Sequence, residues 1–102
     1  LELLLLTLLE AEPMNGYGIG RRIQELTDDA LRIDEGSLYP ALYRMQRRGW
    51  LASSWRQTEN NRRAKFYRVT RRGLKQLHVE AANWAHFTQA VTKILESTNT
   101  GG

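Results

Sequence analysis

The segment GSLYPALYRMQRR, residues 36–48, decides the fold. At 3.6 residues per turn its apolar side chains share one face that can be buried: Leu38, Ala41, Leu42 and Met45. The opposite face is polar and cationic: Ser37, Pro40, Tyr43, Arg44 and Arg47. Ser37 is predicted to cap this helix, which places Pro40 in the first turn, where its missing N–H removes no hydrogen bond. Such a helix is either a solvated surface helix or one that lies in the major groove of DNA.

A second helix is predicted immediately before this one, over residues 15–27, with Asn15 as its N-cap. Its apolar side chains recur at helical spacing: Ile19, Ile23 and Leu26. The glycines at positions 16, 18 and 20 weaken it, and no strand precedes them, which argues against a phosphate-binding loop. We attribute them to a close approach of backbones. Residues 27–35 join the two helices into a helix-turn-helix, and the length of this linker indicates a winged variant.

Two short strands follow the helix, which is predicted to end at Gly49. Residues 50–55 and 64–69 have strand character, and the polar segment between them predicts a hairpin, the wing. Its basic side chains are suited to gripping phosphates or entering a minor groove: Arg56, Arg62, Arg63 and Lys65. The alternative is a mobile solvated loop.

The charge distribution favours the wing. Between Arg44 and Lys75 the chain has eleven Lys or Arg and one acid, Glu59, a net charge of +10. The remainder has four bases and ten acids, a net charge of −6, within a total of +4. Such segregation indicates attraction to a polyanion, for which double-stranded DNA fits best. An anionic membrane surface is the competing partner, but the basic segment lacks the long amphipathic helix that membrane binding favours.

The two ends of the chain predict helices that meet a second subunit. Residues 1–11 are apolar all round, which indicates a helix buried on every side. Thr70 is predicted to cap a long final helix whose apolar positions repeat every seven residues, as in a coiled coil. The side chains expected at a homodimer contact are Leu4, Leu5, Leu8, Leu74, Leu77, Ala81, Trp84, Thr88, Val91 and Leu95. We therefore expect a winged helix-turn-helix domain over residues 1–69, a dimerisation helix over 70–97 and a disordered tail over 98–102.

The composition excludes several other classes of protein. The chain of 102 residues is one domain in size, and it has no cysteine, so disulfides and thiol nucleophiles are excluded. His78 and His86 lie about two helical turns apart, too far to share a metal ion. The apolar run from Leu1 to Leu9 is too short to span a bilayer. We expect a cytoplasmic protein that is not an enzyme and uses no cofactor or metal.

These residues together resemble the PadR family of bacterial transcriptional regulators. The resemblance rests on Gly16-Tyr17 with Ile19, on the run from Gly36 to Leu42 with Arg44, on Gly49-Trp50-Leu51, on Lys65-Phe66-Tyr67 with Val69-Thr70, and on Gly73 with Leu77. These motifs cover most of residues 1–80 in order. The length is similar to that of the short members, in which a single C-terminal helix serves as the dimerisation element.

The resemblance implies a mainly α (α+β) winged helix-turn-helix dimer that represses transcription at a pseudo-palindromic operator and is released by a small molecule. The implied DNA-binding residues are Tyr17, Ser37, Tyr39, Pro40, Tyr43, Arg44, Arg47, Arg62, Arg63 and Lys65. Trp84 stands where some short members stack a flat aromatic effector; the other interpretation is that Trp84 belongs to the dimer core. Two departures from the family pattern are Gly18, where many relatives have an acid, and Asn61-Arg62-Arg63, where many have Gly-Arg-Pro.

The principal alternative is a winged-helix module that contacts other proteins and binds no operator. A module of that kind has no need for a net charge of +10 between Arg44 and Lys75, whereas DNA binding has.

Overall fold

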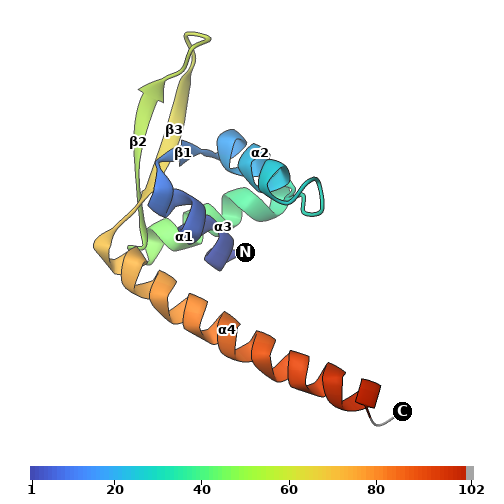
Figure 1. Cartoon of the computed structure of the whole chain (residues 1–102). Helices are drawn as coiled ribbons and strands as arrows, with labels where there is room; N and C mark the ends of the chain where they lie inside the picture. Colours follow the sequence, from blue (N-terminus) through green and yellow to red (C-terminus); the bar gives the residue numbers. More distant parts are fainter. Residues whose placement is uncertain (101–102) are drawn as a thin grey trace.

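The computed structural model describes the fold of residues 1–100 and the side chains of residues 1–98. Four helices and three strands follow one another along the chain: α1 (Glu2–Ala11), β1 (Met14–Asn15), α2 (Gly16–Leu26), α3 (Glu35–Arg47), β2 (Leu51–Gln57), β3 (Arg63–Val69) and α4 (Arg71–Thr100). Figure 1 shows α1, α2 and α3 gathered beside the sheet, the β2–β3 hairpin rising past them, and α4 projecting away from this body. The predicted winged helix-turn-helix is confirmed.

The sheet has one more strand than the sequence predicts. Its order is β1-β3-β2, and all pairs are antiparallel. The hairpin register pairs Leu51 with Val69 at the base and Gln57 with Arg63 at the outer end. Strand β1 pairs Met14 with Tyr67, and it escaped prediction because two residues after a proline carry no alternating pattern. It fixes the start of α2 against the base of the wing.

The core lies where α1, α2, α3, the sheet and the start of α4 meet. Its members are Leu5, Leu6, Leu9, Met14, Ile19, Ile23, Leu38, Ala41, Leu42, Met45, Leu51, Tyr67 and Leu77. Within one chain α1 is buried on one side only, since Leu4 and Thr7 are exposed. Cover of its other side by a second subunit stays a prediction. Leu5 and Leu77 are buried within their own chain, because α1 packs against the first turns of α4. Their side chains are therefore not available to a partner, which corrects the expectation that both lie at a dimer contact.

Helix α3 begins one turn earlier than predicted, because Asp34 rather than Ser37 is its N-cap. The Asp34 carboxylate accepts a hydrogen bond from the Ser37 backbone N–H at 2.7 Å, and its carbonyl accepts one from Leu38 at 3.0 Å. Pro40 consequently lies in the second turn rather than the first, where a proline removes one intrahelical hydrogen bond. The Ser37 side chain remains exposed and free for other contacts.

Replacing Asp34 by alanine is expected to lower the free energy of unfolding by about 1 kcal/mol, the usual cost of losing a side-chain N-cap. Ser37→Ala is the matched control and is expected to cost less than about 0.5 kcal/mol, because only its backbone N–H takes part in the cap. Urea denaturation followed by circular dichroism measures both. A larger loss for Ser37→Ala would restore Ser37 as the cap.

The ends of the elements around the wing agree with the prediction. After α3 the backbone N–H of Gly49 donates to Gln46 and that of Trp50 to Met45, each at 3.0 Å, and Gly49 has φ +80°. This is a Schellman motif with glycine at the left-handed position. The Thr70 hydroxyl accepts from the Gly73 N–H at 3.0 Å, so Thr70 does cap α4. The same hydroxyl donates to the Gly49 carbonyl at 2.6 Å and ties the start of α4 to the end of α3.

Helix α4 is 30 residues long, about 45 Å at 1.5 Å per residue. It gives the molecule a radius of gyration of 16.6 Å, against about 13 Å for a compact chain of this length. The helix continues through Thr98, whose hydroxyl donates to the Leu95 carbonyl at 2.9 Å, so the expectation that it ends at Ser97 is wrong. The remainder of the predicted tail, residues 101–102, lies outside the described residues.

Candidate nucleic-acid interface

The outer face of α3 presents hydrogen-bonding and cationic side chains to solvent. All the residues predicted for it are exposed: Ser37, Tyr39, Pro40, Tyr43, Arg44 and Arg47. The Arg47 guanidinium carbon lies 5.8 Å from the centroid of the Tyr43 ring, close enough for a cation–π contact. Within residues 1–98 the ion pairs involve Arg21, Arg22, Arg32 and Arg48. The α3 cations therefore face solvent without a carboxylate partner in the described part of the chain.

Tyr39 joins α3 to α2 and to the base of the wing. A Cβ on Gly16 would lie 2.6 Å from the Tyr39 ring and hydroxyl, so a larger residue here would displace that ring. The close neighbour of this glycine is an aromatic side chain and not a backbone as expected. Burial raises the pKa of Tyr67 above its usual value of 10.0, and the nearby Tyr39 raises that pKa further. The two rings thus connect the outer face of α3 with strand β3.

Tyr17 lies at the start of α2 and is 70% exposed. The Arg21 guanidinium carbon lies 5.9 Å from its ring centroid, and this guanidinium also reaches the Glu25 carboxylate at 3.5 Å. Arg21 was missed by sequence reasoning, although its position one helical turn after an exposed tyrosine was a usable signal. Together they add a hydrogen-bonding and cationic position beside α3.

The wing has a closed tip and a strongly basic outer end. The Thr58 N–H and hydroxyl both donate to the Arg62 carbonyl, at 2.7 and 3.0 Å, and Asn61 has φ +60°. The side chains of Gln57 and Asn61 bond across the tip. The predicted phosphate-gripping residues Arg56, Arg62 and Arg63 are exposed, and Lys65 is half-buried. Arg63 and Lys65 lie on the hairpin face that carries Tyr67, the neighbour of Tyr39, whereas Arg56 lies on the opposite face over Phe66. The structure therefore brings Arg63 and Lys65, but not Arg56, to the side of the sheet next to α3.

One cation of the basic segment serves the fold instead. The Arg48 guanidinium donates to the Glu2 carboxylate of α1 at 3.3 Å, and its carbon lies 5.1 Å from the Trp50 ring centroid. It is thus directed toward the body rather than toward the outer face of α3. The net charge of +10 counted from the sequence overstates what the interface can use.

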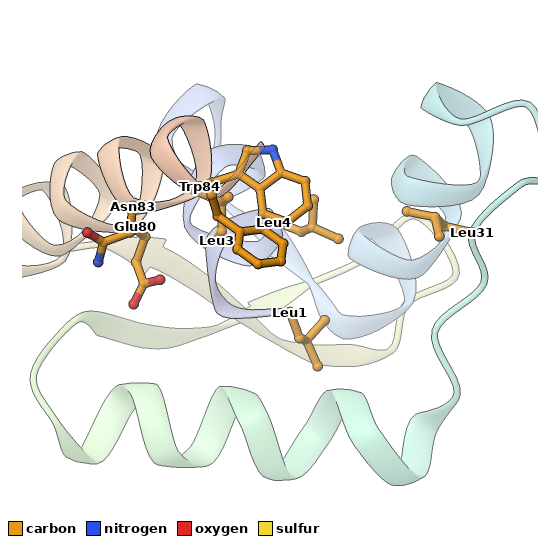
Figure 2. Close-up of a pocket in the computed structure, with 8 residues that line it drawn as sticks. Leu1, Leu3, Leu4, Leu31, Glu80, Asn83 and Trp84 are labelled. Carbon is orange, nitrogen blue, oxygen red and sulfur yellow. The ribbon is translucent and has the colours of Figure 1, made fainter. Parts of the chain in front are cut away.

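A separate apolar groove of about 570 Å³ lies between α1, the α2–α3 connection and α4. Figure 2 shows the Trp84 indole beside the leucines of α1, with Leu31 facing it from the α2–α3 connection. The lining residues are Leu1, Leu3, Leu4, Leu31, Glu80, Asn83, Trp84 and Phe87. The Trp84 and Phe87 rings are 6.1 Å apart and tilted by 39°. Trp84, the predicted effector residue, thus lines a groove of the single chain.

The exposed apolar side chains of α4 form a second heptad pattern that sequence reasoning missed. Trp84, Phe87, Val91 and Ile94 follow one another at intervals of three, four and three residues, which is coiled-coil spacing. Phe87 and Ile94 are exposed, as are Trp84 and Leu95. This stripe includes the Trp84 and Val91 of the predicted one but has Phe87 and Ile94 where the predicted one has Thr88 and Leu95. It continues the apolar groove along the projecting half of α4.

The described residues offer no metal cluster and no membrane-spanning helix. Across residues 1–98 the side chains of His, Asp and Glu form no cluster of three that could hold a metal ion. None of the helices described combines the length and apolarity needed to cross a bilayer.

Comparison with known proteins shows similarity to regulators of transcription. A family model described as the transcriptional regulator PadR-like family matches residues 5–79. A transcriptional regulator from Clostridium thermocellum has 28% sequence identity and a TM-score of 0.84, over 91% of this chain and 90% of that one. A PadR family transcriptional regulator from Eggerthella lenta has 34% identity and a TM-score of 0.78, over 93% and 80% of the two chains. A PadR-like transcriptional regulator from Bacillus cereus has 26% identity and a TM-score of 0.78, over 92% and 89%.

Proposed function

The chain belongs to the PadR-like family of transcriptional regulators, and from this premise we propose that it is a dimeric, sequence-specific DNA-binding repressor released by a small aromatic effector. The family and its structural neighbours are regulators, not enzymes. The observation that carries the proposal is the outer face of α3, where Tyr43, Arg44 and Arg47 are exposed and lack an acidic partner among the described residues.

Helix α3 lies in the major groove of the operator. Arg44 and Arg47 extend from its last turn with Tyr43 beside them. An arginine fork matches the two acceptors that guanine presents in the major groove, so Arg44 is suited to reading a base. Ser37 and Tyr39, nearer the N-terminus of the helix, supply hydroxyls for base edges or phosphates. Tyr17 and Arg21 at α2 contact the adjacent phosphates.

The wing contacts the DNA that flanks the groove occupied by α3. Arg62 lies at the tip, where its carbonyl accepts the two hydrogen bonds of Thr58 and its side chain extends outward. A tip restrained in this way loses less conformational freedom when it binds. Phosphate contacts of this kind position a protein on the duplex without carrying sequence information.

Two copies pair through α4 and present their α3 helices to one side of the duplex. The stripe of Trp84, Phe87, Val91 and Ile94 leaves apolar surface in water that a second copy would cover. A two-fold dimer reads a pseudo-palindromic operator, with its two reading helices about 34–36 Å apart.

The effector occupies the groove beside Trp84. Its walls are mostly leucine with the two aromatic rings of α4, and Glu80 and Asn83 are its polar members. A flat apolar molecule can stack on the Trp84 indole and fill a volume of this size. Since the groove adjoins the apolar stripe of α4, an occupant can change how the subunits pair and so release the operator.

Three substitutions test the separate roles of α3 and the wing. Arg62→Ala is expected to weaken binding to all duplexes by a similar factor, because it removes a phosphate contact. Arg44→Ala or Tyr43→Ala is expected to reduce the preference for operator over random DNA by about 5- to 100-fold, the value of one base contact. Fluorescence anisotropy with a duplex selected from a random pool and with a scrambled duplex measures both. Identical behaviour of all three variants would refute the assignment of α3 to the major groove.

A further inference from the structure

The wing carries a large exposed aromatic side chain that the proposed function has not used. Trp55, in β2, is 60% exposed. It pairs directly with Lys65 across the hairpin, and Arg63 lies on the same face two residues nearer the tip. The Arg63 guanidinium carbon is 5.6 Å from the Trp55 ring centroid. An indole is the aromatic system on which a guanidinium stacks best.

The stacking restricts a side chain that is otherwise free. Arg63 begins β3 and is exposed, and the ion pairs found within residues 1–98 do not include it. Its opposite residue in the register, Gln57, bonds to Asn61, so both ends of the tip are restrained around it. The indole thus holds the cation at the outer end of the wing before any partner binds.

This face of the hairpin is continuous with the DNA-facing side of the body. Lys65 Nζ lies 5.6 Å from the ring centroid of Tyr67, which is next to Tyr39 of α3. The inner end of the same face, at Leu51 and Tyr67, is buried against the core. Trp55 and Arg63 therefore lie on the face of the sheet that the helices cover. They lie farther out along the hairpin, which extends beyond the helices (Figure 1).

We propose that Trp55 is a positioning residue, which holds the Arg63 guanidinium for entry into the minor groove beside each half-site, so that the wing selects A·T-rich flanks. This inference rests on the proposed function. A·T-rich tracts have a narrow minor groove with enhanced negative potential, which attracts an inserted arginine. A G·C pair adds the guanine N2 amino group to that groove and opposes the insertion.

The test compares three duplexes that share one selected core and differ only in the flanks under the wing: A·T, G·C and inosine·C. Inosine·C keeps most of the G·C major-groove pattern but lacks the N2 amino group. The wild-type protein is expected to bind the A·T and inosine·C duplexes about tenfold more tightly than the G·C duplex, the size of one base-pair preference. Trp55→Leu is expected to reduce this ratio below about twofold, and Trp55→Phe to restore part of it.

Two further variants separate positioning from charge. Arg63→Lys keeps the charge but loses the planar fork, so its salt dependence is expected to match wild type while the flank preference disappears. Lys65→Ala is the matched control and is expected to weaken binding to the three duplexes equally. Retention of the flank preference by Trp55→Leu would overturn the inference. Tight binding by the wild type without any flank preference would overturn this inference alone, whereas failure to bind any duplex would overturn the proposed function as well.

Discussion

Raising the salt concentration from about 50 to about 200 mM is expected to weaken DNA binding by about 10³- to 10⁴-fold. Each chain of the proposed dimer offers several exposed cations that form no ion pair within residues 1–98, among them Arg47, Arg62 and Arg63. If about 6–8 phosphates are neutralised, the released counterions give a log–log slope of about −5 to −7. Fluorescence anisotropy with a labelled duplex over a series of salt concentrations measures the slope.

The ion pairs of the structure supply a matched control for this titration. Arg62→Ala is expected to make the slope shallower by about 1 for each phosphate contact that it removes. Arg48→Ala removes the same charge from the chain but is expected to leave the slope nearly unchanged, because Arg48 pairs with Glu2 on the body. A flat salt response in the wild type would contradict DNA binding and favour the alternative, a module that contacts other proteins.

The fold was predictable from sequence wherever the pattern is local and periodic. The apolar face of residues 38–45, the glycine end of α3 and the Thr70 cap each depend on residues within one or two turns of each other. The N-cap of α3 was predicted wrongly, because Asp34 and Ser37 are both residue types that cap helices and they lie only three residues apart. The structure decides for Asp34, whose carboxylate reaches the Ser37 N–H.

Contacts between distant elements were the part that sequence could not supply. Strand β1 exists only because β3 lies beside it, and two residues leave no periodic signal. Leu5 and Leu77 looked equally suited to a partner or to their own core, and only the packing of α1 on α4 places them inside. In the candidate site, the exposed residues of α3 followed from the helical repeat. The stacking of Arg63 on Trp55 did not, because it depends on the register of the hairpin.

Helix α4 has two candidate heptad stripes, which share Trp84 and Val91. The structure indicates which of the two stripes a second copy would cover. The groove opens on Phe87 as well as Trp84, next to Leu1 and to Leu4 of α1. A stripe through Phe87 and Ile94 is more apolar than one through Thr88 and Leu95, because a phenylalanine replaces a threonine, so it gains more free energy when covered. We therefore expect the dimer contact to follow Phe87 and Ile94.

Phe87→Asp and Ile94→Asp are each expected to convert the dimer to monomers, because an unpaired carboxylate at an apolar contact loses its hydration. Operator affinity should fall by about 10²- to 10⁴-fold, since the second half-site then binds without the advantage of being tethered to the first. Sedimentation velocity measures the association state, and anisotropy measures the affinity.

Gln89→Asp places the same charge on the opposite face of α4, where a two-fold partner would leave it in water. It is expected to remain dimeric and to bind the operator within about twofold of wild type, a difference typical of a surface change. Circular dichroism of all three variants should show the same helix content, because each substituted side chain is exposed in one chain and supports no part of the core. Dimers that persist in both Phe87→Asp and Ile94→Asp would show that pairing uses another surface, and the spacing of the α3 helices would then have to be derived from that surface.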